Sequence, residues 1–334
     1  MQPKVTVLMA VYNGEQYLKE AVGSILAQTF PDFELLVIDD GSTDHSPAVI
    51  TSFHDSRIRL VKNEKNIGLT KSLNRGLGLS RGEYIARMDA DEISMPSRLA
   101  KQVSFLEENQ RVGVCGTLIR TKGDGGYVWP FPLEHEEIRA RLLFENCFAH
   151  SSVMIRCSLV RDDKFSYNEK FSCAQDYELW VRLSRHTVMA NIGECLLRHR
   201  IHDARISHQN KGAQENLANN IRMQQLAELP VSVDNDEGVI HHKLAMRTIE
   251  SNRLFFLHSH AWLTKLQYAN SRAGMYSEPS FSKELAYRMN NVLTRMSRLG
   301  WWAAKIILFS PVVRYAGLPV SKRMEYLYRS FFYL

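Results

Sequence analysis

Asp89 and Asp91 are separated by one residue and follow segment 83–88, whose apolar character is typical of a buried strand. Because side chains alternate along a strand, two carboxylates with this spacing can turn to the same side. Carboxylate oxygens are suitable ligands for a hard divalent cation, and a cation held there could neutralise a diphosphate. Aspartates after a strand also form turns or cap the next helix. The spacing alone therefore leaves a metal site and a turn as alternatives.

Polar residues also follow three other segments whose β-rich, apolar composition indicates buried strands. These segments are 5–11, 33–38 and 57–61, and the polar residues that follow them are Tyr12, Asn13, Asp39, Asp40 and Asn66. Helical patterns at 15–28 and 70–79 separate the strands, which predicts an α/β fold with a mostly parallel sheet flanked by helices. Ligands of such sheets bind at the carboxyl ends of the strands. We therefore expect a nucleotide pocket at this edge.

Asp176 opens the pattern 177–185, in which Leu179, Trp180 and Leu183 occupy one face of an amphipathic helix. A helix N-terminus favours the ionised form of a carboxylate. Asp176 is therefore a candidate general base at neutral pH, and a helix cap is the alternative.

Composition and cysteine usage indicate a globular protein from a reducing compartment. The chain has 334 residues, of which 45% are hydrophobic and 23% are charged. This length allows one large domain with an appendage, or two domains. Its five cysteines form no Cys-x-x-Cys pair, which argues against a zinc site or a disulfide scaffold. Segment 1–4 leads directly into the first predicted strand without the pattern of a secretory signal, so we expect a cytoplasmic location.

Six segments together resemble the family 2 inverting glycosyltransferases of the GT-A fold. In chain order they are VYNGEQYL (11–18), SILAQTF (24–30), IDDGSTD (38–44), NIGL (66–69), GEYIARMDAD (82–91) and QDYELW (175–180). The resemblance covers residues 5 to about 205. It implies a catalytic domain at 1–215, with a nucleotide-sugar half at about 1–95 and an acceptor half at about 96–215. It also implies that a sugar passes from a UDP-sugar to a glycan hydroxyl with Mn²⁺ or Mg²⁺ as cofactor.

The resemblance further implies roles for individual residues. Asp39 would accept a hydrogen bond from the uracil N3–H group, although a turn is the simpler alternative. Asp91 would ligate the metal, Asp89 would contact metal or ribose, and Asp176 would be the base. The other residues expected at the nucleotide are Val11, Tyr12, Asn13, Asn66, Lys71 and Arg87.

Several positions in the resemblance keep alternatives open. Arg87 would reach phosphate or form a surface ion pair. His202 is expected near the metal or the diphosphate, whereas His150 would border the acceptor site or form a hydrogen bond inside the fold. Glu92 stands where the family more often has a third aspartate, and this leaves the metal preference undecided.

The region 216–334 lies outside the resemblance, and its patterns are helical and basic. From 282 to 334, nine Lys and Arg stand against two Glu, a local charge of +7, whereas the whole chain carries +6. The apolar run after Trp301 is interrupted by Lys305 and Pro311, which argues against a membrane-spanning helix. Basic, tryptophan-rich helices bind anionic membrane surfaces. Packing on the catalytic domain or in a homodimer is the alternative, and no motif for reading nucleic acid accompanies the charge.

These features predict a metal-dependent inverting glycosyltransferase of bacterial surface polysaccharide synthesis. Its acceptor would be a lipid-linked oligosaccharide at the cytoplasmic face of the membrane, where the chain would bind peripherally. A sugar-1-phosphate nucleotidyltransferase has a similar sheet but needs a glycine-rich basic loop after the first strand, and segment 12–15 is not one. A scaffold that binds UDP-sugar without turnover is the second alternative, against which the presence of Asp176 argues.

Overall fold

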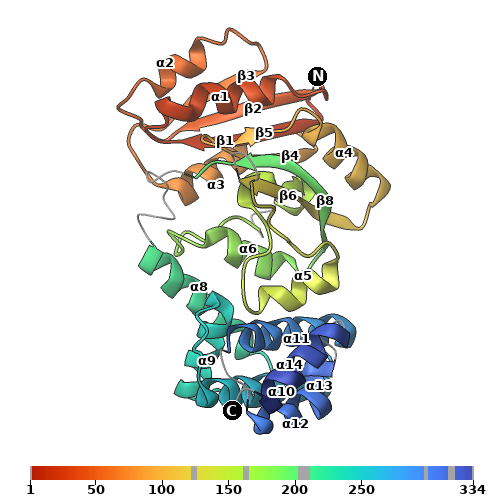
Figure 1. Cartoon of the computed structure of the whole chain (residues 1–334). Helices are drawn as coiled ribbons and strands as arrows, with labels where there is room; N and C mark the ends of the chain where they lie inside the picture. The colour runs from red at the N-terminus through yellow and green to blue at the C-terminus, as the bar shows by residue number, and fades with distance from the viewer. Residues whose placement is uncertain are drawn as a thin grey trace. The chain divides into compact units, whose positions relative to one another are not determined.

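The computed structural model describes residues 2–121, 126–160, 165–201, 211–296, 300–314 and 320–332. The chain divides into two compact units (Figure 1). The first unit comprises Met1–His135 and Cys147–Leu217, and the second comprises Glu136–Asn146 and Ala218–Leu334. From the sequence we predicted a catalytic domain at 1–215, which included residues 136–146. In the structure, this short segment belongs to the second unit.

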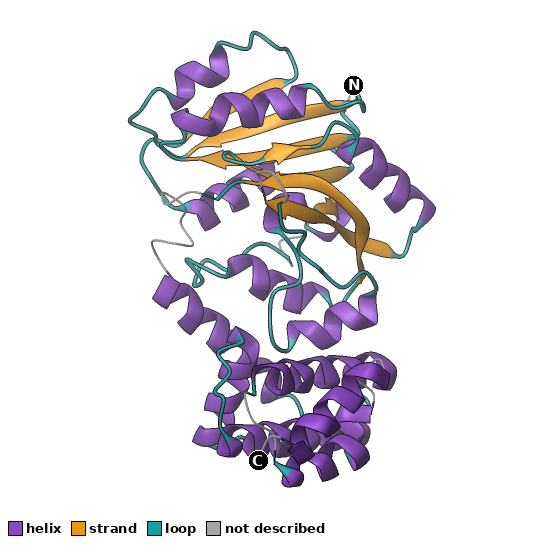
Figure 2. Ribbon diagram, in the orientation of Figure 1, coloured by secondary structure: helices purple, strands orange, loops and turns teal. Residues whose placement is uncertain are grey.

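The first unit is built on one eight-stranded sheet in the order β3-β2-β1-β4-β7-β6-β8-β5 (Figure 2). The strands are β1 (Val5–Val11), β2 (Phe33–Asp39), β3 (Ile58–Lys62), β4 (Tyr84–Asp89), β5 (Ile93–Ser94), β6 (Val112–Thr121), β7 (Met154–Arg156) and β8 (Val188–His199). Strands β3, β2, β1 and β4 are parallel, whereas β7 is antiparallel to both β4 and β6. The predicted mostly parallel α/β sheet is confirmed.

Helices cover both faces of this sheet. They are α1 (Glu15–Leu26), α2 (Ser46–Thr51), α3 (Leu69–Leu79), α4 (Arg98–Glu108) and α6 (Gln175–Leu183). The buried side of α1 shares a core cluster with Val7 and Met9 of β1. The neighbouring Leu8 points to the opposite face, because side chains alternate along a strand. There it contacts α3 at Gly76, where a larger residue would clash with the Leu8 side chain.

The burial of the first two strands explains their composition. Every residue of β1 and of β2 is buried, and a strand covered on both faces has a nearly continuous apolar sequence rather than an alternating one. The strand ends are consequently the first places where polar side chains can reach solvent or a ligand.

The second unit is helical. Its helices are α5 (His135–Leu142), α8 (Lys211–Leu226), α9 (Asn235–Met246), α10 (Arg253–Ala273), α11 (Glu278–Arg295), α12 (Trp301–Phe309), α13 (Pro311–Arg314) and α14 (Val320–Phe332), of which α5 and α8 begin in the first unit. The sequence predicted an amphipathic helix at 282–299. Helix α11 covers this segment as far as Arg295 and buries Leu285, Met289 and Val292, whereas 297–299 lie outside the described residues. This is the face that the sequence indicated.

The segment Glu136–Asn146 forms part of the core of this helical unit. Leu143 and Phe144 are fully buried in the same cluster as residues of α9, α10 and α11. Three polar side chains of the unit bind its backbone: Arg222 Nε donates to the Phe144 carbonyl at 2.6 Å, Gln225 Nε2 donates to the Leu142 carbonyl at 2.9 Å, and His241 Nε2 lies 3.0 Å from the Leu143 carbonyl oxygen. The segment is thus held by both apolar and polar contacts.

Candidate active site

The carboxyl ends of β1, β2 and β4 lie side by side. In the strand register, Val11 is opposite Asp39, and Ala10 is opposite Asp89. The ends of β2 and β4 therefore flank the end of β1. We predicted the candidate residues at this edge, and the structure brings Asp39 and Asp89 there on the two strands that flank β1.

The two aspartates at the end of β2 have different partners. Asp39 is only 2% exposed, and its Oδ1 accepts a hydrogen bond from the Ser42 backbone N–H at 3.0 Å. Asp40 accepts bonds from the backbone N–H groups of Ile67 and Gly68, both at 2.9 Å, and from Asn63 Nδ2 at 2.7 Å. Asp40 consequently fixes the loop that leads into α3.

The loops after β1 and β2 are tied together. Asn13 has a left-handed backbone with φ of 51°, its N–H donates to Ser42 Oγ at 3.0 Å, and its Oδ1 accepts from the Thr43 N–H at 2.9 Å. The side chain of Asn13 therefore shapes this edge from within the loop pair. Tyr12 is half exposed beside it.

Asn66 and Lys71 lie near this edge on the next connection. Both are exposed, and Asn66 Oδ1 accepts a hydrogen bond from the Gly68 N–H at 3.1 Å. Gly41 has a φ of 74°, and a Cβ there would lie 2.6 Å from the Lys65 carbonyl carbon. This close approach holds the loop before α3 against the end of β2.

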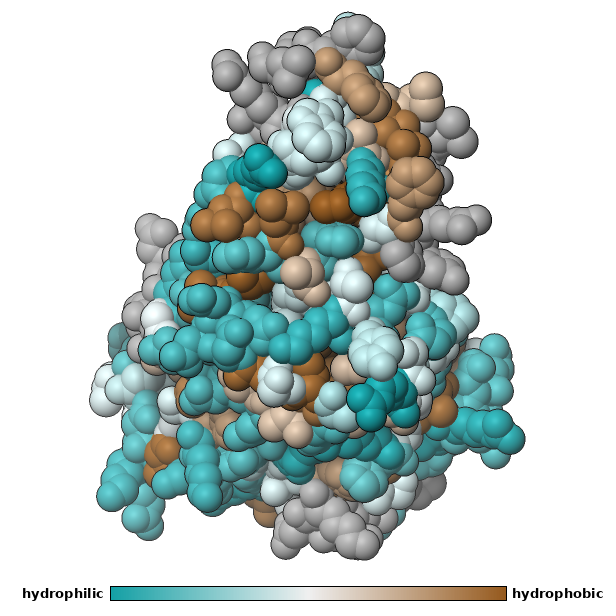
Figure 3. Space-filling model, turned by 90° about the horizontal axis from the view of Figure 1, so that it is seen from below, coloured by the Kyte–Doolittle hydropathy of each residue, from teal (hydrophilic) through white to brown (hydrophobic). Residues whose placement is uncertain are grey.

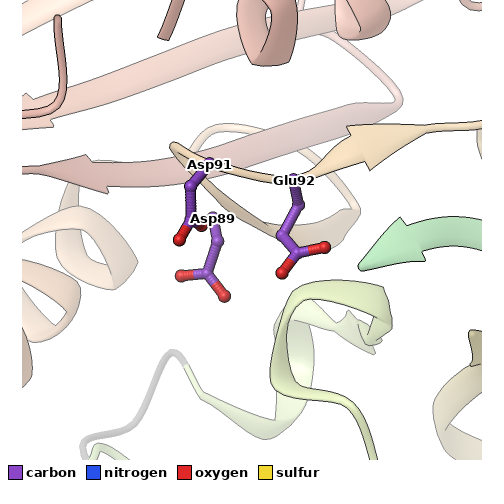
Figure 4. A group of neighbouring side chains, drawn as sticks. All are labelled: Asp89, Asp91 and Glu92. Carbon is purple, nitrogen blue, oxygen red and sulfur yellow. The ribbon is translucent and has the colours of Figure 1, made fainter. Parts of the chain in front are cut away.

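Three carboxylates gather where β4 ends. One ligand oxygen each from Asp89, Asp91 and Glu92 lies within 4.8 Å of the others, and Figure 4 shows the three side chains pointing to the same side of the chain. Asp89 and Asp91 are partly exposed, whereas Glu92 is buried. Glu92 Oε2 has no hydrogen-bond partner among the described residues. A set of acidic oxygens with an unsatisfied buried member fits a hard divalent cation.

Two residues at and just after the end of β8 contact this acidic turn. His199 Nδ1 lies 2.6 Å from Glu92 Oε1, and Arg200 Nε donates to the Asp91 carbonyl at 3.0 Å. Burial raises the pKa of Glu92 to about 7 against the opposing effect of His199, and Asp89 and Asp91 add to the increase. This carboxyl group therefore changes charge near neutral pH, unlike an ordinary glutamate.

His199 was missed by the sequence reasoning, which selected His202 instead. His202 lies outside the described residues. A signal was available, since His199 stands two positions after the buried Leu197 and alternation puts both on one side of β8. What the sequence did not reveal is the antiparallel pairing of β8 with β5, which sets Arg198 opposite Ile93.

Arg87 lies on β4, two residues before Asp89, and its side chain is buried. It is only 3% exposed and forms an ion pair with Asp89, which points to the same side of β4. Although burial opposes the charged form, Asp89 and Tyr167 keep the pKa of Arg87 above its ordinary value. Its Nε has no hydrogen-bond partner among the described residues. The ion pair considered from the sequence thus joins a buried guanidinium to a partly exposed carboxylate.

Asp176 is the second residue of α6, which begins two residues before the predicted helix at 177–185. The helix follows Ala174, which has a left-handed conformation with φ of 56°. Burial raises the pKa of Tyr167, and the charges of Asp176 and Asp89 act on it in the same direction. Both carboxylates are therefore close enough to Tyr167 to influence its ionisation. Tyr167 was not singled out from the sequence, because no motif surrounds it.

His150 forms a hydrogen bond inside the fold, one of the two roles considered for it. Its Nε2 lies 2.7 Å from the Tyr167 hydroxyl, and burial, together with the charge of Arg87, holds its pKa well below the usual value. Trp180 of α6 is fully buried, and its ring lies near those of His150 and Phe148. This group of rings fixes α6 and hence Asp176.

A mostly parallel sheet with helices on both faces is the architecture of the GT-A fold. TarS of S. aureus in complex with UDP-GlcNAc has this fold, with a TM-score of 0.60, 17% identity, and coverage of 86% of this chain and 89% of that chain. The mannosyltransferase PcManGT of Pyrobaculum calidifontis in complex with GDP-Man and Mn²⁺ has a TM-score of 0.52 and 15% identity, covering 98% of this chain and 85% of its own.

The chain belongs to glycosyltransferase family 2. The model of "Glycosyl transferase family 2" matches residues 6–163. An uncharacterized glycosyltransferase of Haemophilus influenzae is 34% identical over 252 residues, which are 72% of this chain and 78% of the relative. The predicted family, fold class and glycosyltransferase activity are confirmed, which favours sugar transfer over the nucleotidyltransferase and scaffold alternatives.

Two further relatives have names that state a biosynthetic role. The O-antigen biosynthesis glycosyltransferase WbnJ of Escherichia coli is 33% identical, over 60% of this chain and 80% of the relative. The UDP-Glc:alpha-D-GlcNAc-diphosphoundecaprenol beta-1,3-glucosyltransferase WfgD of Escherichia coli is 28% identical, over 61% of this chain and 79% of the relative.

Proposed function

We propose that this glycosyltransferase moves a sugar from a UDP-sugar to a hydroxyl of a lipid-linked glycan in surface polysaccharide synthesis. The observation that carries the proposal is the shared edge of β2, β1 and β4, where Asp39 and the acidic turn of Asp89, Asp91 and Glu92 flank one strand. The end of this edge at Asp39 would bind the nucleobase, and the end at the acidic turn would bind a metal ion and the diphosphate. The complex of TarS with UDP-GlcNAc and the name of WfgD support this assignment.

Asp91 and Asp89 would hold Mn²⁺ or Mg²⁺. When bound, such an ion stabilises the departing diphosphate as a Lewis acid. The donor set is purely acidic oxygen, which these ions favour over softer metals. The Mn²⁺ in the complex of PcManGT supports this part of the proposal. Arg87 would act through Asp89, whose carboxylate it orients from the buried side.

The nucleotide would lie along the loops after β1 and β2. Asp39 would accept the uracil N3–H, since an ionised carboxylate accepts a strong bond from an imide. The other residues proposed at this side are Val11, Tyr12, Asn13, Asn66 and Lys71. Asn13 would contribute by holding the loop shape, because its amide oxygen already binds Thr43.

Asp176 would act as the general base. It would take the proton from the acceptor hydroxyl as that oxygen attacks the anomeric carbon opposite the diphosphate, which inverts the configuration. The nearby His150–Tyr167 pair stays uncharged at neutral pH, because burial lowers the pKa of His150 and raises that of Tyr167. Asp176 is therefore the member of this group that is suited to accept a proton.

A lipid-linked acceptor would require the enzyme to work at a membrane surface. No helix among the described residues combines the length and the apolarity needed to cross a bilayer. We propose peripheral binding to an anionic membrane through the basic C-terminal region, on the cytoplasmic face. A homodimer through the same region is the alternative.

The test is the release of UDP from a panel of UDP-sugars with Mn²⁺ or Mg²⁺, without acceptor. We expect slow hydrolysis of one donor, loss of metal-dependent UDP binding in Asp91→Ala, and a rate lower by roughly 100- to 10,000-fold in Asp176→Asn with UDP binding retained. Glu108→Gln, a surface substitution on α4, is the matched control. Wild-type protein that does not bind UDP, or binds it regardless of metal and of Asp91, would refute the proposal.

A further inference from the structure

Helix α12 exposes a stripe of large apolar residues. Ala303, Ala304 and Ile307 face the core of the helical unit. On the other side of the helix, Trp301 is 71% exposed and Phe309 is 76% exposed. Soluble proteins rarely leave side chains of this size so open in one place without a partner.

Helix α14 packs against α12 and repeats the arrangement. Tyr326 and Ser330 are buried, whereas Met324, Tyr328 and Phe331 are 59%, 56% and 52% exposed. Residues three or four positions apart lie on one side of a helix, so these three exposed side chains form a second stripe. We name the exposed apolar residues of the two helices the docking face. It consists of Trp301, Leu308, Phe309, Met324, Tyr328 and Phe331.

The surroundings of the docking face are basic. Residues 301–332 contain five Lys and Arg and a single acidic residue, Glu325. Glu325 lies 3.4 Å from Lys322 and 3.9 Å from Arg329, so its charge is compensated locally. Lys305 is exposed one helical turn from Trp301 and forms no ion pair with another described residue. Figure 3, which views the molecule from below, shows hydrophobic side chains gathered in its upper part and hydrophilic ones across its lower part.

We propose that the docking face binds the surface of an anionic lipid bilayer. Aromatic side chains are stable at the level of the lipid headgroups, aliphatic ones enter the acyl region, and lysine stems reach back to the phosphates. Anionic lipids complement the positive charge, whereas two copies of the same basic face would repel each other. This charge argument favours a membrane over a second copy of the chain.

The inference deepens the proposed function and rests on it in one respect, the lipid-linked acceptor. Neither apolar insertion nor charge attraction alone gives firm binding to a membrane, whereas the two signals together do. The docking face supplies both within two neighbouring helices. It would keep the catalytic unit near acceptors that are confined to the bilayer.

The experiment is flotation of the full chain with vesicles of phosphatidylcholine, alone or mixed with phosphatidylglycerol. We expect flotation only with the mixed vesicles and weaker binding at high salt, since salt screens the charges. The double variant Trp301→Ala and Phe309→Ala should partition at least about tenfold less well, and Lys305→Glu should weaken binding further at low salt. Tyr127→Ala is the matched control, because Tyr127 is a 61% exposed aromatic residue of the first unit.

Each outcome decides the proposal. Equal flotation of the double variant and the wild type would overturn it, as would wild-type protein that stays unbound. If unbound wild-type protein sedimented as a dimer that the double variant disrupted, the face would be a contact between copies of the chain. Metal-dependent UDP binding is measured on the same samples and needs no vesicle, so its loss would mark failure of the proposed function and not of membrane docking.

Discussion

At the scale of single residues, the most informative contact is the one between Arg87 and Asp89. A buried guanidinium is stable only when its charge is matched, and here the matching carboxylate is also a proposed metal ligand. The pair therefore links the interior of the sheet to the proposed diphosphate end of the site. Groups that orient a metal ligand typically change metal affinity by about 10- to 100-fold when they are removed.

We accordingly predict that Arg87→Met weakens the Mn²⁺-dependent binding of UDP by about tenfold or more. Calorimetric titration of UDP with and without Mn²⁺ measures this effect directly. Arg87→Lys, which keeps a charge, should recover part of the loss. Arg59→Met, which removes an arginine paired with Glu34 at 3.1 Å on β3, is the control. Unchanged UDP binding in a folded Arg87→Met protein would show that Asp89 needs no such support.

Residues at the strand ends could be predicted, but residues brought in by distant strands could not. Asp89 and Asp91 stand out because a buried strand delivers them, and their spacing is visible in the chain. The role of His199 depends on the pairing of β8 with β5, which joins positions about a hundred residues apart. Local patterns carry no information on such a pairing.

At the scale of elements, the segment Glu136–Asn146 shows how chain order can mislead. It lies between β6 and β7 in sequence, so it was assigned to the catalytic part. Its buried apolar side chains nevertheless pack with α9, α10 and α11. A helical spacing indicates which face is buried but not what buries it.

We predict that Phe144→Ala lowers the free energy of unfolding by about 3–5 kcal/mol, the usual cost of removing a fully buried aromatic ring. Phe144 also packs with Arg288, whose guanidinium lies 4.7 Å from the ring centre. Urea denaturation followed by circular dichroism gives the measurement, with the exposed Tyr127→Ala as control. A change below about 1 kcal/mol would contradict the burial of this segment.

His241 makes the stability of the same region depend on pH. Burial lowers the pKa of His241 to about 3, and its Nδ1 accepts a hydrogen bond from Trp262 Nε1 at 3.2 Å. The unfolded chain takes up a proton near pH 6.5, whereas the folded protein does not until far lower pH. Stability contributed by this residue is therefore complete above about pH 6.5 and is lost as the pH falls toward 3.

We predict that this loss approaches about 1.4 kcal/mol for each pH unit below 6.5. Unfolding curves at pH 7 and pH 5 should differ less in His241→Phe than in the wild type. Leu254→Ala, which changes an exposed residue of α10 that does not titrate, should leave the difference unchanged. An equal pH response in His241→Phe would assign the effect to other groups.

At the scale of the whole molecule, the first unit could be predicted from sequence and the second only in part. Alternating strands and helices with polar ends indicate an α/β sheet and its ligand edge, because both follow from local patterns. The helical unit has no alternation of strands and helices from which its topology could be inferred. Each of its amphipathic helices could pack against any of several others. Its basic charge was evident, but the exposure of Phe309 and Phe331 required the packing of α12 against α14.

The path of the chain between the two units has a consequence for how such enzymes diversify. The backbone passes from one unit to the other after His135, returns after Asn146 and passes again after Leu217. In one kind of chimera, only the residues after Leu217 come from a relative. The native 136–146 segment would then have to pack against core residues from another protein, to which its side chains are not matched. A single crossover near Leu217 is thus disfavoured. We expect residues 218–334 to be exchanged between relatives together with the 136–146 segment, which lies inside the sequence of the first unit.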